Sequence, residues 1–158
     1  MKEKNCCFTG HRILPTEKLP EIIRRLEAVI EELIQQGVIY YGCGGALGFD
    51  QLAGEAVLKL KKKHQHIKLI MVLPCREQDK NWPQAEKDRH RSLLAACDKI
   101  VYVQEEYNKD CMLKRNRHLV DNSGVCAAWF TGRPGGTKYT INYARQQGVP
   151  VINTAAQS

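Results

Sequence analysis

Loops that are rich in glycine or carry an arginine recur along this chain, and both features suit the binding of an anion. Glycine lets backbone N–H groups approach a ligand closely, and an arginine guanidinium can fork onto a phosphate. Each of these loops follows a short apolar run, so each lies where a buried strand is expected to end. The loops are residues 10–12, 42–50, 74–76 and 133–137.

The loop at residues 133–137 joins the apolar run at residues 125–130 to a predicted helix at residues 138–147. Gly135 and Gly136 form its turn, and Thr137 is placed to cap the helix. The first N–H groups of a helix have no partner within the helix and are open to a ligand. They favour an anion such as a phosphate, although a tight turn without a ligand is an equally simple interpretation.

Two carboxylates lie near these loops, and any hydrolytic chemistry would have to recruit them. Asp50 is near the start of a predicted helix, where it can cap amides or hold a ribose hydroxyl. Glu55 follows five residues later and faces either the same crevice or a neighbouring cation.

Two basic side chains are further candidates. Arg115 stands on a later, largely apolar helix, where it either contacts the ligand or is solvated. Beside Arg12, His11 either donates to a phosphate or shapes the turn.

These considerations give one set of candidate site residues. If the protein is an enzyme, the candidate catalytic residues are Asp50, Glu55 and Arg115. The candidate ligand-binding residues are Gly10, His11, Arg12, Gly44, Gly45, Asp50, Glu55, Arg115, Gly135, Gly136 and Thr137.

The apolar patterning predicts strands and helices in alternation. Helices with apolar residues every three or four positions separate the apolar runs, and glycines such as Gly37 and Gly148 end them. The predicted strands are residues 5–9, 38–41, 67–73, 99–103, 125–130 and 149–153. Five helices are predicted: the first begins near residue 15, the second begins near residue 49, and the third ends near residue 96. The fourth and fifth occupy residues 111–121 and 138–147.

This order predicts one α/β domain over residues 1–158, with a Rossmann-like, doubly wound, mostly parallel sheet and helices on both faces. Ligands of such sheets bind outside the carboxyl ends of the strands. The four loops follow those ends, so segments far apart in the sequence are expected to meet at one crevice.

Composition narrows the class of protein further. The net charge of +7 favours anionic partners without choosing between nucleotide and nucleic acid. No apolar run approaches the roughly 20 residues of a membrane span, and no signal peptide is expected, so we predict a cytoplasmic protein. The seven cysteines lack CxxC spacing; we expect reduced thiols and no metal site.

Four segments of the chain, in order, resemble the YpsA-like branch of the SLOG superfamily. They are F-T-G-H-R (residues 8–12), G-C-G-G-A-L-G-F-D-Q-L-A-G-E (residues 42–55), M-L-K-R-N (residues 112–116) and R-P-G-G-T (residues 133–137). The superfamily also includes the LOG-type phosphoribohydrolases and the DprA DNA-processing proteins. The resemblance implies a Rossmann-like fold and a site for a nucleotide or nucleotide-derived ligand, but no defined reaction.

The sequence departs from both better-known branches of that superfamily. Arg115 matches the arginine of the LOG signature, but Asn116 replaces its lysine and Asn142 its glutamate. An amide cannot act as a carboxylate base. Leu47 stands where the DprA segment has an arginine.

We therefore expect a sensor or adaptor that binds ADP-ribose, an NAD-like compound or a nucleoside phosphate. No cofactor is expected to be required. The alternatives are a LOG-like nucleoside 5′-monophosphate N-glycosidase and a DprA-like DNA-binding module. We do not expect specific DNA binding or a membrane partner, while a protein partner and a homodimer remain open.

Overall fold

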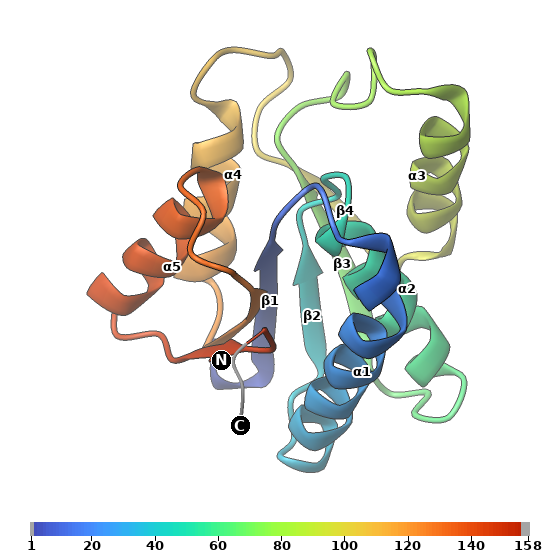
Figure 1. The fold of residues 1–158 in the computed structure, drawn as a ribbon, viewed down its shortest axis with the longest axis vertical. Helices are drawn as coiled ribbons and strands as arrows, with labels where there is room; N and C mark the ends of the chain where they lie inside the picture. Colours follow the sequence, from blue (N-terminus) through green and yellow to red (C-terminus); the bar gives the residue numbers. More distant parts are fainter. Residues whose placement is uncertain (1, 156–158) are drawn as a thin grey trace.

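The computed structural model describes residues 2–155, which form a six-stranded sheet with helices on both faces (Figure 1). All five strand pairs are parallel. Their order is β4-β3-β2-β1-β5-β6, so the predicted Rossmann-like α/β fold is confirmed. The strands are β1 (Asn5–Gly10), β2 (Tyr40–Cys43), β3 (Lys68–Leu73), β4 (Lys99–Tyr102), β5 (Val125–Trp129) and β6 (Val151–Asn153).

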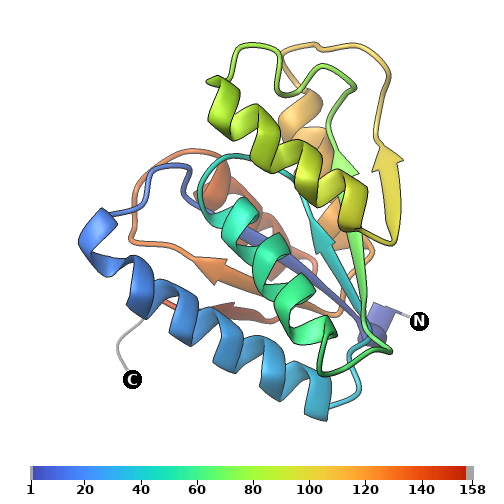
Figure 2. The same cartoon turned by 90° about the vertical axis from the view of Figure 1, so that its right-hand side faces the viewer.

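The helices divide into two groups, and the sheet lies between them. Helices α1 (Leu19–Gln35), α2 (Phe49–Lys61) and α3 (Gln84–Ala96) cover one face, which Figure 2 shows from the helix side. Helices α4 (Cys111–Asp121) and α5 (Gly136–Gln146) cover the other face (Figure 1). Two short 3₁₀ turns, η1 (Lys2–Lys4) and η2 (Thr16–Lys18), precede β1 and α1.

The strands are buried on both faces, as their apolar runs require. Neighbouring residues of β1 illustrate this arrangement. Cys6 packs in the core that contains Leu26 of α1, and Cys7 packs in the core that contains Leu119 of α4. All seven cysteines are free. Within residues 2–155, no helix is long and apolar enough to cross a membrane, and no cluster of three or more potential ligands could hold a metal ion.

Helix α5 begins earlier than the sequence predicts, and this changes the role of Thr137. Gly136 is the first residue of the helix and Gly135 is its N-cap residue, so Thr137 lies inside the first turn and does not cap it. The N-cap makes no side-chain hydrogen bond to the helix, because glycine has no side chain to offer. The first turn of α5 is therefore left without a capping group from its own N-cap residue.

The connections of the sheet place a crevice between β1 and β5. The chain leaves β1 toward α1 on one face and leaves β5 toward α5 on the other (Figure 1). The two strands are neighbours, with Cys7 beside Cys126 and Gly10 beside Trp129. In sheets of this kind the loops diverge where the direction of winding reverses, and ligands bind there.

Candidate functional site

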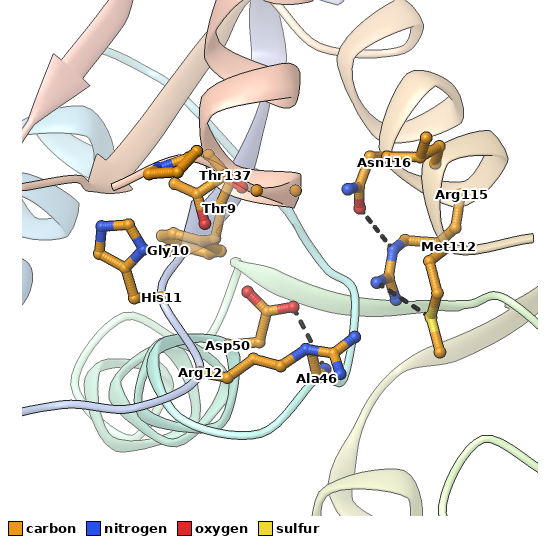
Figure 3. Close-up of a pocket in the computed structure, with 15 residues that line it drawn as sticks. Thr9, Gly10, His11, Arg12, Ala46, Asp50, Met112, Arg115, Asn116 and Thr137 are labelled. Carbon is orange, nitrogen blue, oxygen red and sulfur yellow. Dashed lines mark hydrogen bonds between the residues drawn. The ribbon is translucent and has the colours of Figure 1, made fainter. Parts of the chain in front are cut away.

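A cavity of about 380 Å³ opens at the carboxyl ends of β1 and β5 (Figure 3). Its walls come from the loop after β1, the start of α2, helix α4 and the start of α5. Eight of the candidate residues line it: Gly10, His11, Arg12, Asp50, Arg115, Gly135, Gly136 and Thr137. Segments more than 100 residues apart in the sequence thus meet at one site, as the topology predicts for three of the four loops. The loop at residues 74–76 contributes no lining residue, and its Arg76 pairs with Glu105 instead.

The start of α5 forms one wall of the cavity and presents backbone N–H groups. Gly135 has φ = 136°, a conformation that L side chains rarely adopt, and a Cβ atom there would meet nothing within 4 Å. Backbone conformation, and not space, therefore requires glycine at this position. The first turn carries no acidic residue. The N–H groups of Gly136 and Thr137 have no partner within the helix, so this wall attracts an anion.

Arg12 supplies a positive charge at the mouth of the cavity. Its side chain is exposed and lies across from Asp50 (Figure 3). Within residues 2–155 no hydrogen bond or salt bridge holds its guanidinium, and its charge acts on Asp50 through space. Arg12 is consequently available to a ligand.

Asp50 is the carboxylate of the cavity, and it is 93% shielded from solvent, with 7% exposure. Its Oδ2 accepts a hydrogen bond from the backbone N–H of Ala46, at 3.2 Å. Burial raises the pKa of Asp50, while the nearby charge of Arg115, the Ala46 N–H and the charge of Arg12 act in the opposite direction.

Arg115 is almost completely buried, with 3% exposure, and most of its donors are used by the protein itself. Nη1 donates to the carbonyl oxygen of Gly44, and Nε donates to Oδ1 of Asn116 at 2.7 Å. Nη2 lies 3.9 Å from the sulfur of Met112. Burial lowers the pKa of Arg115, and the Asp50 carboxylate partly offsets this. Arg115 thus supports the site as well as lining it.

His11 connects the loops that follow β1 and β5. Its Nε2 accepts a hydrogen bond from the backbone N–H of Thr131, at 3.1 Å, so the proton of the neutral ring is on Nδ1. The ring packs edge-on against Trp129, with 5.5 Å between ring centroids. Burial lowers the pKa of His11, and the charge of Arg133 lowers it further. The environment therefore favours the neutral form.

Gly44 and Gly45 do not line the cavity and lie behind it instead. The Gly44 carbonyl accepts hydrogen bonds from both Arg115 and Nε2 of Gln78, the latter at 3.1 Å. A Cβ atom on Gly44 would lie 2.7 Å from Nη1 of Arg115, so glycine is needed here for close approach. The glycine-rich loop therefore serves contacts within the protein, through Gln78, a residue that no sequence pattern singled out.

Glu55 is not part of the cavity. Both of its carboxylate oxygens accept hydrogen bonds from Arg89 of α3, at 2.6 Å each. Successive residues of a helix are rotated by about 100°, so a residue five positions after Asp50 points about 140° away from it. The sequence leaves two alternatives for Glu55, the crevice or a neighbouring cation, and the structure shows the cation, which is Arg89.

The position that corresponds to the LOG glutamate also lies outside the cavity. Asn142 is exposed on α5, whereas Asn116, in place of the LOG lysine, lines the cavity and accepts from Arg115. Of the described residues that line the cavity, Asp50 alone is a carboxylate. Thr9, at the end of β1, also lines it and was not among the candidates; its position next to Gly10 is the signal that could have found it.

Comparison with known proteins identifies relatives across most of the chain. The family model YpsA, described as the YspA SLOG family, matches residues 14–150. The SPbeta prophage-derived protein YoqJ of Bacillus subtilis is 39% identical over 135 residues, which are 77% of this chain and 79% of YoqJ. The UPF0398 protein BH1768 of Halalkalibacterium halodurans is 32% identical over 129 residues, which are 80% of this chain and 68% of that protein.

Solved structures of DNA processing protein A share the fold. The Helicobacter pylori protein, whose structure is described for its single-stranded DNA binding mode, superimposes with a TM-score of 0.68 and 23% identity over 93% of this chain. The Streptococcus pneumoniae protein gives a TM-score of 0.66 and 17% identity over 95% of this chain. The match spans 63% and 50% of those two chains.

Proposed function

The chain belongs to the YspA SLOG family, and on that premise we propose that it binds a nucleotide or nucleotide-derived ligand as a sensor or adaptor. One observation carries the proposal. Arg12, whose guanidinium is not held by the described residues, and the first turn of α5, whose N-cap offers no side chain, face the same cavity. This cavity lies where the winding of the sheet reverses between β1 and β5.

The chemistry of these walls suits a phosphate group. Backbone N–H groups of Gly136 and Thr137 donate to phosphate oxygens without a competing carboxylate in the first turn of the helix. Arg12 adds a charge-assisted hydrogen bond, of the kind that contributes about 1.5–3 kcal/mol. The volume of about 380 Å³ falls within the usual range of small-molecule sites.

A LOG-like hydrolase finds less support in the same cavity. Its pattern calls for a carboxylate on the helix after the glycine turn, and Asn142 is both an amide and exposed. Asp50 remains as a candidate base, because Glu55 is paired with Arg89. We expect AMP to stay intact during long incubation with concentrated protein. Steady release of adenine that is abolished by Asp50→Asn and retained in Glu55→Gln would instead support the hydrolase.

Calorimetric titration with AMP and with ADP-ribose tests the proposal. Arg12→Ala should weaken binding by roughly ten- to a hundredfold, which corresponds to the loss of one charge-assisted contact. The matched control is Arg145→Ala, because it removes the same charge from an exposed position in the last turn of α5. Equal losses in both variants would indicate nonspecific attraction to the net charge. Absence of binding to the unaltered protein at millimolar concentrations would contradict the proposal.

A further inference from the structure

A second cavity adjoins the first on the far side of His11. It measures about 300 Å³, and His11 lines both cavities. Figure 3 places His11 at the opposite side of the first cavity from Arg115 and Met112. The first cavity is therefore bounded by the buried Arg115 at one end and adjoins the second cavity at the other. A ligand that extends from the first cavity into the second therefore passes along His11, the residue that lines both.

One wall of the second cavity is apolar. Ile13, Leu14 and Pro15, in the loop between β1 and η2, line it together with Trp129. Ile13 is 77% exposed and is the most exposed large hydrophobic side chain within residues 2–155. The flat, apolar face of a nucleobase would remove such a side chain from water, which is favourable.

The second cavity also carries two cations. Lys18 and Arg133 line it, and both are exposed. Arg133 lines the second cavity together with His11, the residue that the two cavities share, and its charge lowers the pKa of His11. No carboxylate is found among the described residues that line this second cavity. An anionic group near His11 would thus meet positive charge on either side, from Arg12 and from Arg133.

We propose that the two cavities form one extended site for a dinucleotide, in which two nucleoside units are linked through phosphate. One unit occupies the first cavity, the linking phosphates pass His11 between Arg12 and Arg133, and the second base packs on Ile13. This inference rests on the proposed function and makes it specific, because a mononucleotide in the first cavity would leave Ile13 and Arg133 without a contact.

Titration with AMP and with diadenosine diphosphate tests the extended site. The unaltered protein should bind the dinucleotide at least about tenfold more tightly than AMP. Ile13→Ser and Arg133→Ala should each weaken binding of the dinucleotide by about five- to tenfold, and both should leave AMP binding within about twofold. Both side chains are exposed, so neither change is expected to prevent folding.

Two controls separate local contacts from general effects. Ile100→Ser replaces another exposed isoleucine, on the edge strand β4, and Arg145→Ala removes an equal charge from the end of α5. Neither should change the affinity for the dinucleotide. If AMP binds and the dinucleotide binds no more tightly, or if Ile13→Ser and Arg133→Ala weaken both ligands alike, the extended site is wrong. If neither ligand binds the unaltered protein, the proposed function itself fails.

Discussion

The guanidinium of Arg115 donates to the backbone carbonyl of Gly44, a residue 71 positions earlier in the chain. This contact joins α4 to the loop that leads into α2, and the first turn of α2 carries Asp50, which lines the cavity. The charges of Arg115 and Asp50 also act on each other, because each opposes the effect of burial on the other's pKa. The two side chains are therefore expected to behave as one buried unit.

Removing Arg115 should destabilise the fold. Arg115→Met removes the charged donor to the Gly44 carbonyl, a kind of hydrogen bond that contributes about 1.5–3 kcal/mol, and leaves the buried Asp50 without its main positive neighbour. Urea unfolding would measure the change in the free energy of unfolding. The double variant Arg115→Met/Asp50→Asn should be less destabilised than the sum of the two single variants. Additive effects would show that the two residues do not interact.

The stability of the protein should fall as the solution is acidified, in part because of His11. Burial lowers the pKa of folded His11 from its ordinary value of about 6.5. As the pH falls below about 6.5, the unfolded chain takes up a proton that the folded protein refuses, so the free energy of unfolding decreases until the folded pKa is passed.

The comparison that isolates this effect is between the unaltered protein and His11→Gln. His90 has a pKa lowered in the same direction and is present in both proteins. Unfolding experiments between about pH 7 and pH 5 should give a shallower pH dependence for His11→Gln. The same slope in both proteins would contradict the environment assigned to His11.

Glu55→Gln should leave ligand binding unchanged. Glu55 pairs with Arg89, and the two side chains are 42% and 33% exposed. Such partly exposed pairs contribute about 0.2–1 kcal/mol to stability, so the variant should fold normally. Its affinity for AMP should stay within about twofold of that of the unaltered protein. A loss as large as that expected for Arg12→Ala would place Glu55 in the site after all.

Binding to single-stranded DNA should be weak and sensitive to salt. The net charge of +7 attracts any polyanion, and this kind of attraction falls steeply between about 50 and 200 mM salt. Fluorescence anisotropy of a labelled oligonucleotide would follow it. Submicromolar affinity that survives about 200 mM salt would favour a DprA-like function over the proposed one.

The sequence predicts the fold well because apolar runs and helix-ending glycines agree along the whole chain. The first and last residues of a strand are predicted less accurately where hydrogen bonding to a neighbouring strand, and not the apolar pattern, determines them. Strand β2 begins two residues later than predicted, at Tyr40, which pairs with the first residue of β3, Lys68. It also ends two residues later, because Gly42 and Cys43 pair with Ile70 and Met71 of β3. Strand β6 begins after Pro150, which lacks an N–H to donate and offers only its carbonyl, to Cys126.

The sequence predicts which residues line the cavity only where their position directly after a strand is enough to place them there. The residues after β1 and β5 reach the cavity because strand ends do so in any parallel sheet. The sequence of a glycine-rich loop, in contrast, does not show whether a ligand or a protein side chain approaches its backbone. At Gly44 the approaching group is the Arg115 side chain. The partner of Glu55 lies on α3, 34 residues later, and local spacing carries no information about such a contact.

The most direct test of the proposed site is a titration of ¹⁵N-labelled protein with AMP, followed through the backbone amide signals. At 18.0 kDa the protein is well suited to this measurement. We predict saturable shifts that are largest for Gly135, Gly136 and Thr137 and for the residues around Arg12. Shifts confined to other exposed lysine-rich segments, such as residues 59–63, or no shifts at millimolar AMP, would contradict the account.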